Sequence, residues 1–276
     1  MSFLANVLRI LDSEMTRPET FGWFHILWLL IIAAATILLC RFGGHVSEEK
    51  ISKIVLWVAV AVAVLEVYKQ INYTFIVKDG VINTDYQWYS FPFQFCSMPM
   101  YVGILQGVVK KGKVRSALLS VLATYGLFAG LCVMVYPGDV FIRTIGINIQ
   151  TMICHGTMVV IGVYLLYTGA ARLCHKTILG ALAVFSWAVL VAVTLNEIMF
   201  YSGALGDETF NMFFVSRHFE PSLPVYSLVQ DLVPYPFCLI IYIAGFTAAA
   251  YIILLLAMLA KKIFGKKEQE TCKNDI

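Results

Sequence analysis

The two residues best suited to covalent chemistry in this sequence are Cys96 and His155, which lie far apart in the chain. Cys96 stands in FPFQFCSMP, where Pro92 and Pro99 interrupt a helix and leave backbone N–H groups free. A thiol beside an imidazole can become a thiolate nucleophile, and free N–H groups can stabilise an acyl oxyanion. We therefore predict a Cys96–His155 dyad, which requires the two side chains to meet in the fold.

Further polar residues interrupt apolar stretches at similar expected depth, and each has a functional and a purely structural interpretation. Because burying a polar group in a membrane is costly, such residues usually face the bundle interior and carry function. An ion pair or polar contacts between helices would explain them equally well. The candidates for substrate binding or orientation are His25, Glu66, Lys69, Gln94, Gln150, Asn196 and Glu197.

Specific roles follow for some of these residues. Asn196 or Glu197 is expected to orient His155, as the third member of a triad does. Glu66, Lys69 and Gln94 are expected to hold a head group or polarise a carbonyl.

A zinc site is a weaker alternative, because no HExxH or similar spacing joins its potential ligands. Those ligands would be His25, His155, Glu66 and Glu197.

The composition is that of an all-α polytopic membrane protein. Of 276 residues, 60% are hydrophobic and 13% charged, with a mean hydropathy of +0.80, whereas soluble domains carry about a quarter charged residues. A membrane-spanning helix needs about 20 mostly apolar residues. Seven transmembrane helices are predicted, at 22–41, 52–76, 89–109, 114–135, 146–168, 177–201 and 235–260.

The distribution of basic residues predicts the orientation, because cytoplasmic loops are enriched in Lys and Arg. One side collects Arg41, Lys50, Lys53, Lys110, Lys111, Lys113, Arg115, Arg172, Lys176 and the five lysines after position 260. The other side has Arg9, Arg17, Lys78, Arg143 and Arg217. We therefore expect the N-terminus outside and the C-terminus in the cytoplasm.

Three regions are predicted along the chain. Residues 1–20 contain a short amphipathic stretch, which predicts an interfacial helix on the outer leaflet. Residues 21–261 form the seven-helix transmembrane domain, and residues 262–276 form a basic cytoplasmic tail. The loop at about 202–234 is rich in Phe and Pro, so we expect it to pack onto the outer face as a lid. The cysteines show no paired spacing, and no disulfide framework is expected.

Four segments resemble a known family, the bacterial YwaF-type integral membrane proteins and their eukaryotic relatives, the transmembrane-protein-164 acyltransferases. They are TFGWFHILWLL, FPFQFCSMP, TMICHGTMVV and NMFFVSRHFEPSL with the following VPYPFCLIIY. The resemblance implies a seven-helix fold, with Cys96 as nucleophile and His155 as base. Asn211 lies in the segment that resembles the Asn-rich stretch of the family. The family often has His two residues before the cysteine, whereas this chain has Gln94.

The function expected from residues and resemblance together is a cysteine-dependent lipid acyltransferase or lipid ester hydrolase that acts through an acyl-thioester. Its partner would be a phospholipid or another acyl lipid in the plasma membrane, with no cofactor and no nucleic acid. The alternative is a transporter or ligand-binding membrane protein whose outer polar residues form a vestibule. Oligomeric state, acyl donor and acyl acceptor stay open.

Overall fold

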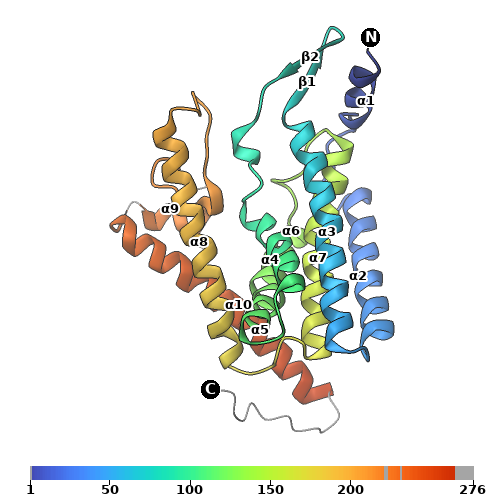
Figure 1. Cartoon of the computed structure of the whole chain (residues 1–276), viewed down its shortest axis with the longest axis vertical. Coiled ribbons are helices and arrows are strands. Elements are labelled where there is room, and N and C mark those ends of the chain that lie inside the picture. The colour runs from blue at the N-terminus through green and yellow to red at the C-terminus, as the bar shows by residue number, and fades with distance from the viewer. Residues whose placement is uncertain (1, 221–222, 231, 265–276) are drawn as a thin grey trace.

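The chain folds into an elongated bundle of helices, seen here in a computed structural model that describes residues 2–220, 223–230 and 232–264. The N-terminal helix and a small β-hairpin lie at one end of the bundle, and the last long helix finishes at the opposite end (Figure 1). Residues 265–276, most of the predicted cytoplasmic tail, lie outside the described residues.

Six helices within the described ranges are long and apolar enough to cross a membrane. Five of them are α2 (Trp23–Gly43), α3 (Glu48–Asn72), α7 (Ile145–Thr168), α8 (Lys176–Ser202) and α10 (Tyr235–Phe264). The sixth is continuous through α5 (Lys113–Val121), the π-helical turn η3 (Leu122–Gly126) and α6 (Leu127–Val135). These helices confirm the predicted mostly helical membrane fold.

The predicted span at 89–109 is not a continuous helix, and this prediction is corrected. It consists of two 3₁₀ turns, η1 (Trp88–Ser90) and η2 (Phe95–Ser97), followed by α4 (Met98–Val108). The 11 residues of α4 extend only about 16 Å, roughly half of a bilayer core. Pro92 cannot continue a helix, whereas Pro99 is tolerated in the first turn of α4 because that turn needs no intrahelical N–H donor.

A β-hairpin that the hydropathy pattern did not reveal follows α3. Strand β1 (Phe75–Lys78) pairs antiparallel with β2 (Val81–Thr84). Asp79 and Gly80 at the turn both have positive φ, 52° and 78°, as a two-residue type I′ turn requires. The hairpin projects beyond the ends of the helices beside the short helix α1 (Phe3–Leu11) (Figure 1).

Helix α7 is the centre of the bundle and packs against α2, α3 and α6. Most of its apolar length is buried, whereas α2 and α10 expose most of theirs. Gly130 lets α6 approach α7 closely, because a Cβ there would lie 2.8 Å from the carbonyl oxygen of His155. The position of α7 therefore buries several of its polar side chains, among them Gln150, Thr151 and His155.

The long loop after α8 packs into the bundle, as its aromatic content predicts. It contains η4 (Met212–Phe214) and α9 (Pro224–Gln230). Phe210 and Phe213 are fully buried, and the Phe213 ring lies 5.5 Å from that of Phe95. The loop thus covers the segment that carries Cys96, although its action as a lid stays a prediction.

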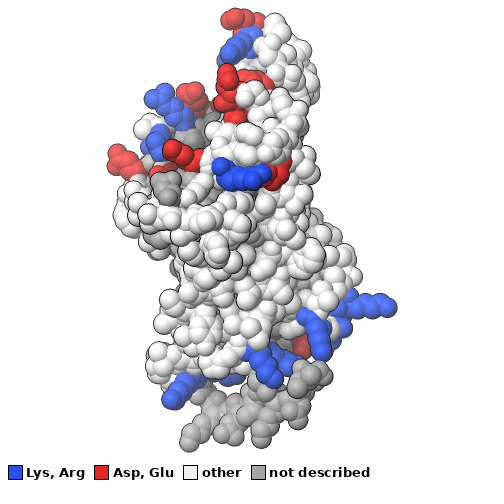
Figure 2. Space-filling model, turned by 90° about the vertical axis from the view of Figure 1, so that its left-hand side faces the viewer, with Lys and Arg blue, Asp and Glu red and all other residues white. Residues whose placement is uncertain are grey.

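Charged side chains gather at the two ends of the molecule, with an uncharged band between them (Figure 2). One end displays charges of both signs, and the other displays mainly Lys and Arg (Figure 2).

Among the cysteines, Cys40, Cys96, Cys132, Cys154 and Cys238 are free. Cys174 is disulfide-bonded.

Candidate functional site

Cys96 lies in η2, in the irregular segment that precedes α4. Its thiol donates a long hydrogen bond to Gln94 Oε1, with Sγ and oxygen 3.7 Å apart. The Gln94 amide in turn donates to the carbonyl of Tyr89 at 2.8 Å. Gln94 therefore contacts the candidate nucleophile directly.

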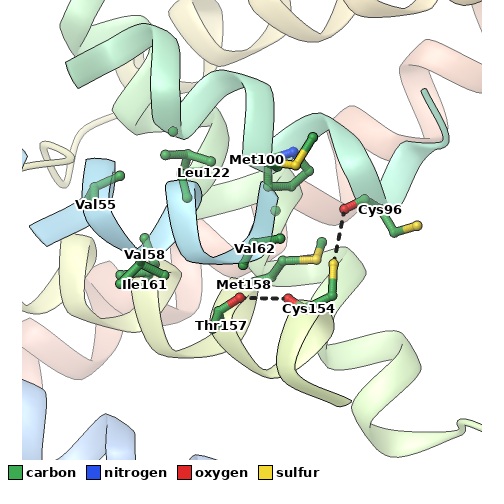
Figure 3. Close-up of a pocket in the computed structure, with 14 residues that line it drawn as sticks. Val55, Val58, Val62, Cys96, Met100, Leu122, Cys154, Thr157, Met158 and Ile161 are labelled. Carbon is green, nitrogen blue, oxygen red and sulfur yellow. Dashed lines mark hydrogen bonds between the residues drawn. The ribbon is translucent and has the colours of Figure 1, made fainter. Parts of the chain in front are cut away.

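A narrow apolar cavity of about 40 Å³ lies beside Cys96 (Figure 3). Its walls come from α3, α4, η3 and α7, and they include Val62, Met100, Leu122 and Met158. Cys154 on α7 also lines it and donates from Sγ to the Cys96 carbonyl oxygen at 3.8 Å. Figure 3 shows the Cys96 sulfur directed away from Cys154, while its carbonyl oxygen faces that thiol.

His155 is buried in α7, with 6% of its surface exposed. Its Nδ1 lies 2.8 Å from the Thr151 carbonyl oxygen, one helical turn earlier. A carbonyl only accepts, so Nδ1 carries the proton and Nε2 of the neutral ring keeps a lone pair. No residue in the described part of the chain bonds to that Nε2. The ring is thus oriented for a base that accepts a proton at Nε2.

Cys96 and His155 belong to neighbouring segments but make no hydrogen bond to each other in the described chain. Cys154, the residue before His155, touches the Cys96 backbone. The Lys69 ammonium acts electrostatically on both the Cys96 thiol and the His155 ring. The Lys69 charge thus acts on both predicted residues, and the Cys96 sulfur bonds to Gln94 rather than to the imidazole.

Glu66, Lys69 and Gln70 form a buried polar network on α3. Lys69 Nζ lies 2.8 Å from Glu66 Oε1, and both side chains are about nine-tenths buried. The Gln70 amide donates to Glu66 Oε1 and to the Ser90 carbonyl, each at 2.9 Å. Tyr86 donates to Gln70 Oε1 at 2.8 Å. This network anchors the 86–90 segment to α3 and fixes the charge near Cys96.

His25 lies in a separate cluster, with both ring nitrogens bonded to main chain. Nδ1 accepts from the Phe21 N–H at 2.9 Å, and Nε2 donates to the Met134 carbonyl at 2.8 Å. The ring is fully buried and packs beside Phe141. These contacts give His25 a structural role that joins the start of α2 to the end of α6.

The triad role expected for Asn196 or Glu197 is corrected, because neither residue contacts His155. Asn196 makes two bonds to the Met212 backbone, accepting from its N–H at 2.8 Å and donating to its carbonyl at 3.1 Å. Glu197 accepts from two nitrogens of Arg217. Asn196 therefore holds the long loop to α8, and Thr151 is the residue that orients His155.

The Glu197–Arg217 pair lies at the outer surface of that loop. Hydrogen bonds and charge from Glu197 raise the pKa of Arg217 above its usual value. His218 also approaches Glu197, with Nε2 3.2 Å from Oε1, and its ring stacks on Phe200. The pair fastens the loop and takes no part in the Cys96 surroundings.

The two remaining predicted residues differ in their surroundings. Gln150 is buried on α7, within the turn that also carries Thr151. Asn211 accepts from the Ser216 N–H at 2.8 Å and donates to the carbonyls of Phe219 and Glu220 at 3.4 Å. Asn211 therefore shapes the loop, and these contacts do not connect it to Cys96.

Cys154 was not among the residues predicted from the sequence, although it lines the cavity beside Cys96. The signal was its position immediately before His155, which put a second thiol on the same helix turn. In the part of the chain that the structure describes, no group of three or more His, Cys, Asp or Glu side chains is arranged to hold a metal ion.

Six apolar helices and a buried polar site define a multi-pass α-helical membrane protein. The model of the TMEM164 family matches residues 20–259, and the chain belongs to this family. No curated protein and no solved structure matches the chain. Family membership thus covers α2 to α10 and includes Cys96, His155 and the polar network.

Proposed function

We propose that this protein transfers acyl groups from a membrane lipid through a thioester on Cys96, as an acyltransferase or lipid ester hydrolase. The observation that carries the proposal is the setting of Cys96. Its thiol lies next to an apolar cavity, beside the helix that presents an unprotonated imidazole nitrogen. The apolar lining of this cavity suits part of an alkyl chain, and the Lys69 charge that acts on Cys96 suits an ester carbonyl.

The first half-reaction would begin with proton transfer from Cys96 Sγ to His155 Nε2. The thiolate adds to the ester carbonyl carbon, the C–O bond breaks, and the leaving alkoxide takes the proton from His155. In the second half-reaction His155 deprotonates a lysolipid hydroxyl, an alcohol or water. That oxygen attacks the thioester, the C–S bond breaks, and the thiolate regains a proton.

This chemistry requires the Cys96 side chain to rotate from Gln94 toward α7. The bond that it would leave is weak, because a thiol donor at 3.7 Å from an amide oxygen contributes little. The Lys69 ammonium favours a Cys96 thiolate and a developing oxyanion, whereas burial of the thiol and the charge of Glu66 oppose the thiolate. The Gln94 amide would then have its second N–H group available to donate to the substrate carbonyl.

The membrane arrangement proposed with this function has seven crossings. The irregular segment 85–97 and α4 together make the third crossing, so the N-terminus lies outside and the α10 end inside. The mixed-charge end and the mainly basic end in Figure 2 support this orientation. We place the protein in the plasma membrane and, by the segments quoted above, among the bacterial YwaF-type members of the family.

The test is acylation of purified full-length protein by a phospholipid with an alkyne-tagged acyl chain. We expect a hydroxylamine-sensitive label on Cys96, located by peptide mass spectrometry and absent from Cys96→Ala. The matched control Cys154→Ala should keep the label, because Cys154 lies in the same cavity without being the nucleophile. Lipid binding without any covalent label in the wild type would instead favour the vestibule of a transporter or receptor.

A further inference from the structure

A second cavity, of about 570 Å³, lies at the end of the bundle where α5 and α8 begin. It shares no lining residue with the cavity beside Cys96. The charged residues that line it are Glu48, Lys111, Lys113, Arg115, Arg172 and Lys176. Five cations against one carboxylate make this cavity strongly basic.

Several of these cations are already engaged, Arg172 among them. The Arg115 guanidinium donates to the Val109 carbonyl and pairs with Glu49 at 3.1 Å. Lys111 pairs with Glu48 at 2.5 Å. By contrast, Lys113 and Lys176 have no ion pair within the described residues, and both are exposed. The cavity therefore keeps at least two uncompensated positive charges.

The backbone adds to the same potential, because Lys113 and Lys176 are the first residues of α5 and α8. These helices pack against each other and begin at the same cavity. Neither start has a side-chain cap hydrogen bond, and the hydroxyl of Ser116 also lines the space. The positive ends of two helices favour an anion with several acceptor oxygens, and at α8 the Thr177 and Ile178 N–H groups already donate to the carbonyls of Cys174 and His175.

We propose that this cavity binds the phosphate of an anionic phospholipid in the cytoplasmic leaflet. A lipid is favoured over a free phosphate by the apolar surface that adjoins the cations. Val114 is 60% exposed and Leu179 is 63% exposed, each within three residues of a cavity lysine. With the phosphate in the cavity, the acyl chains lie along this apolar surface of α5 and α8. This lipid is separate from the acyl donor proposed for Cys96.

The experiment titrates the purified full-length protein with short-chain phosphatidylglycerol, with phosphatidylcholine of the same chain length, and with inorganic phosphate. Apparent affinity is measured by native mass spectrometry and by the shift in unfolding temperature. We expect selective binding of phosphatidylglycerol. In the double variant Lys113→Gln/Lys176→Gln, that affinity should fall roughly 10- to 30-fold, as the loss of two basic contacts implies.

The matched control is Lys50→Gln/Lys53→Gln, which removes the same charge from exposed positions on α3 outside the cavity. It should bind phosphatidylglycerol like the wild type. Equal loss in both double variants would show diffuse attraction and overturn the proposal. Equal binding of phosphatidylcholine, or tight binding of inorganic phosphate alone, would also overturn the proposal.

If the double variant unfolds without lipid, the single variants Lys113→Gln and Lys176→Gln replace it, each with a smaller expected loss. Acylation of Cys96 serves as a separate readout, so failure of one proposal leaves the other distinguishable.

Discussion

Two buried histidines occupy regions of the molecule that use the imidazole in opposite ways. His25 donates from Nε2 to the Met134 carbonyl and accepts at Nδ1 from Phe21, so its polar atoms are saturated by main chain. His155 donates from Nδ1 to the Thr151 carbonyl and keeps its Nε2 lone pair. The two rings are therefore opposite neutral tautomers, each fixed by a backbone carbonyl.

The difference between these regions shows that burial alone does not identify a reactive histidine. The His25 region closes the start of α2 over aromatic packing and, among the described residues, contains no charged partner of the ring. The His155 region adjoins two cysteines, an ion pair and an apolar cavity. The two histidines differ in whether a ring nitrogen remains free to accept a proton, and in whether a thiol lies nearby to donate one.

Replacing His155 should produce the largest effect and gives the most direct way to break this comparison. In His155→Ala, loss of the base is expected to lower the rate of Cys96 acylation about 100- to 10,000-fold. The rate is measured by time-resolved labelling with the tagged phospholipid. His45→Ala, on an exposed loop residue, is the control and should keep the wild-type rate. An unchanged rate in His155→Ala would remove the dyad from the mechanism.

Removing the Lys69 charge should have the next largest effect, because it leaves Glu66 buried without its cation. We expect Lys69→Met to lower the free energy of unfolding by about 3–5 kcal/mol. Glu66→Gln/Lys69→Met removes both charges and should recover most of that loss. Denaturation in detergent measures the two values. Equal stability of the single and double variants would mean that the pair is not buried as described.

His25→Ala should reverse the pattern expected for His155→Ala. It leaves the buried Phe21 N–H and Met134 carbonyl without their partners, at about 1–3 kcal/mol for each unsatisfied group. The unfolding temperature should fall, while the folded fraction should still acylate Cys96 at the wild-type rate. If His25→Ala kept its stability but acylated Cys96 slowly, His25 would take part in the reaction, and the two histidines would not differ in role.

Gly103→Ala should change stability and acylation rate the least, and it tests whether the α3–α4 contact belongs to the Cys96 region. A Cβ there would lie 2.7 Å from the Ala59 Cβ, so α4 must shift from α3 at a cost of about 1–3 kcal/mol. The shift would distort the cavity beside Cys96 and slow acylation. Gly245→Ala, where a Cβ meets nothing within 4 Å, is the matched control and should change neither property.

Hydropathy predicted the long helices well because the bilayer imposes one dominant requirement on them. Segments such as 146–168 and 177–201 agree with α7 and α8 within two residues at each end. Depth in the membrane was much less informative about contacts. Asn196 and His155 were expected at one depth, yet Asn196 bonds the Met212 backbone. A one-dimensional depth does not specify which way around its helix a side chain points.

Local chain geometry explains the other differences. The prolines at 92 and 99 were visible in the sequence, but hydropathy alone extended a span across them. The Asp79–Gly80 pair that turns the β-hairpin was equally visible and is a strong hairpin signal. In contrast, the bonds of Gln94 to Cys96 and of Cys154 to the Cys96 carbonyl depend on tertiary packing. No spacing rule predicts such contacts.

The β1–β2 hairpin also offers a practical marker of sidedness. Its turn stands away from the transmembrane helices (Figure 1), and Lys78 and Asp79 are exposed. A short epitope inserted between Asp79 and Gly80 would extend a solvated tip without entering the bundle. Antibody staining of unpermeabilised cells would then report directly which compartment the hairpin faces.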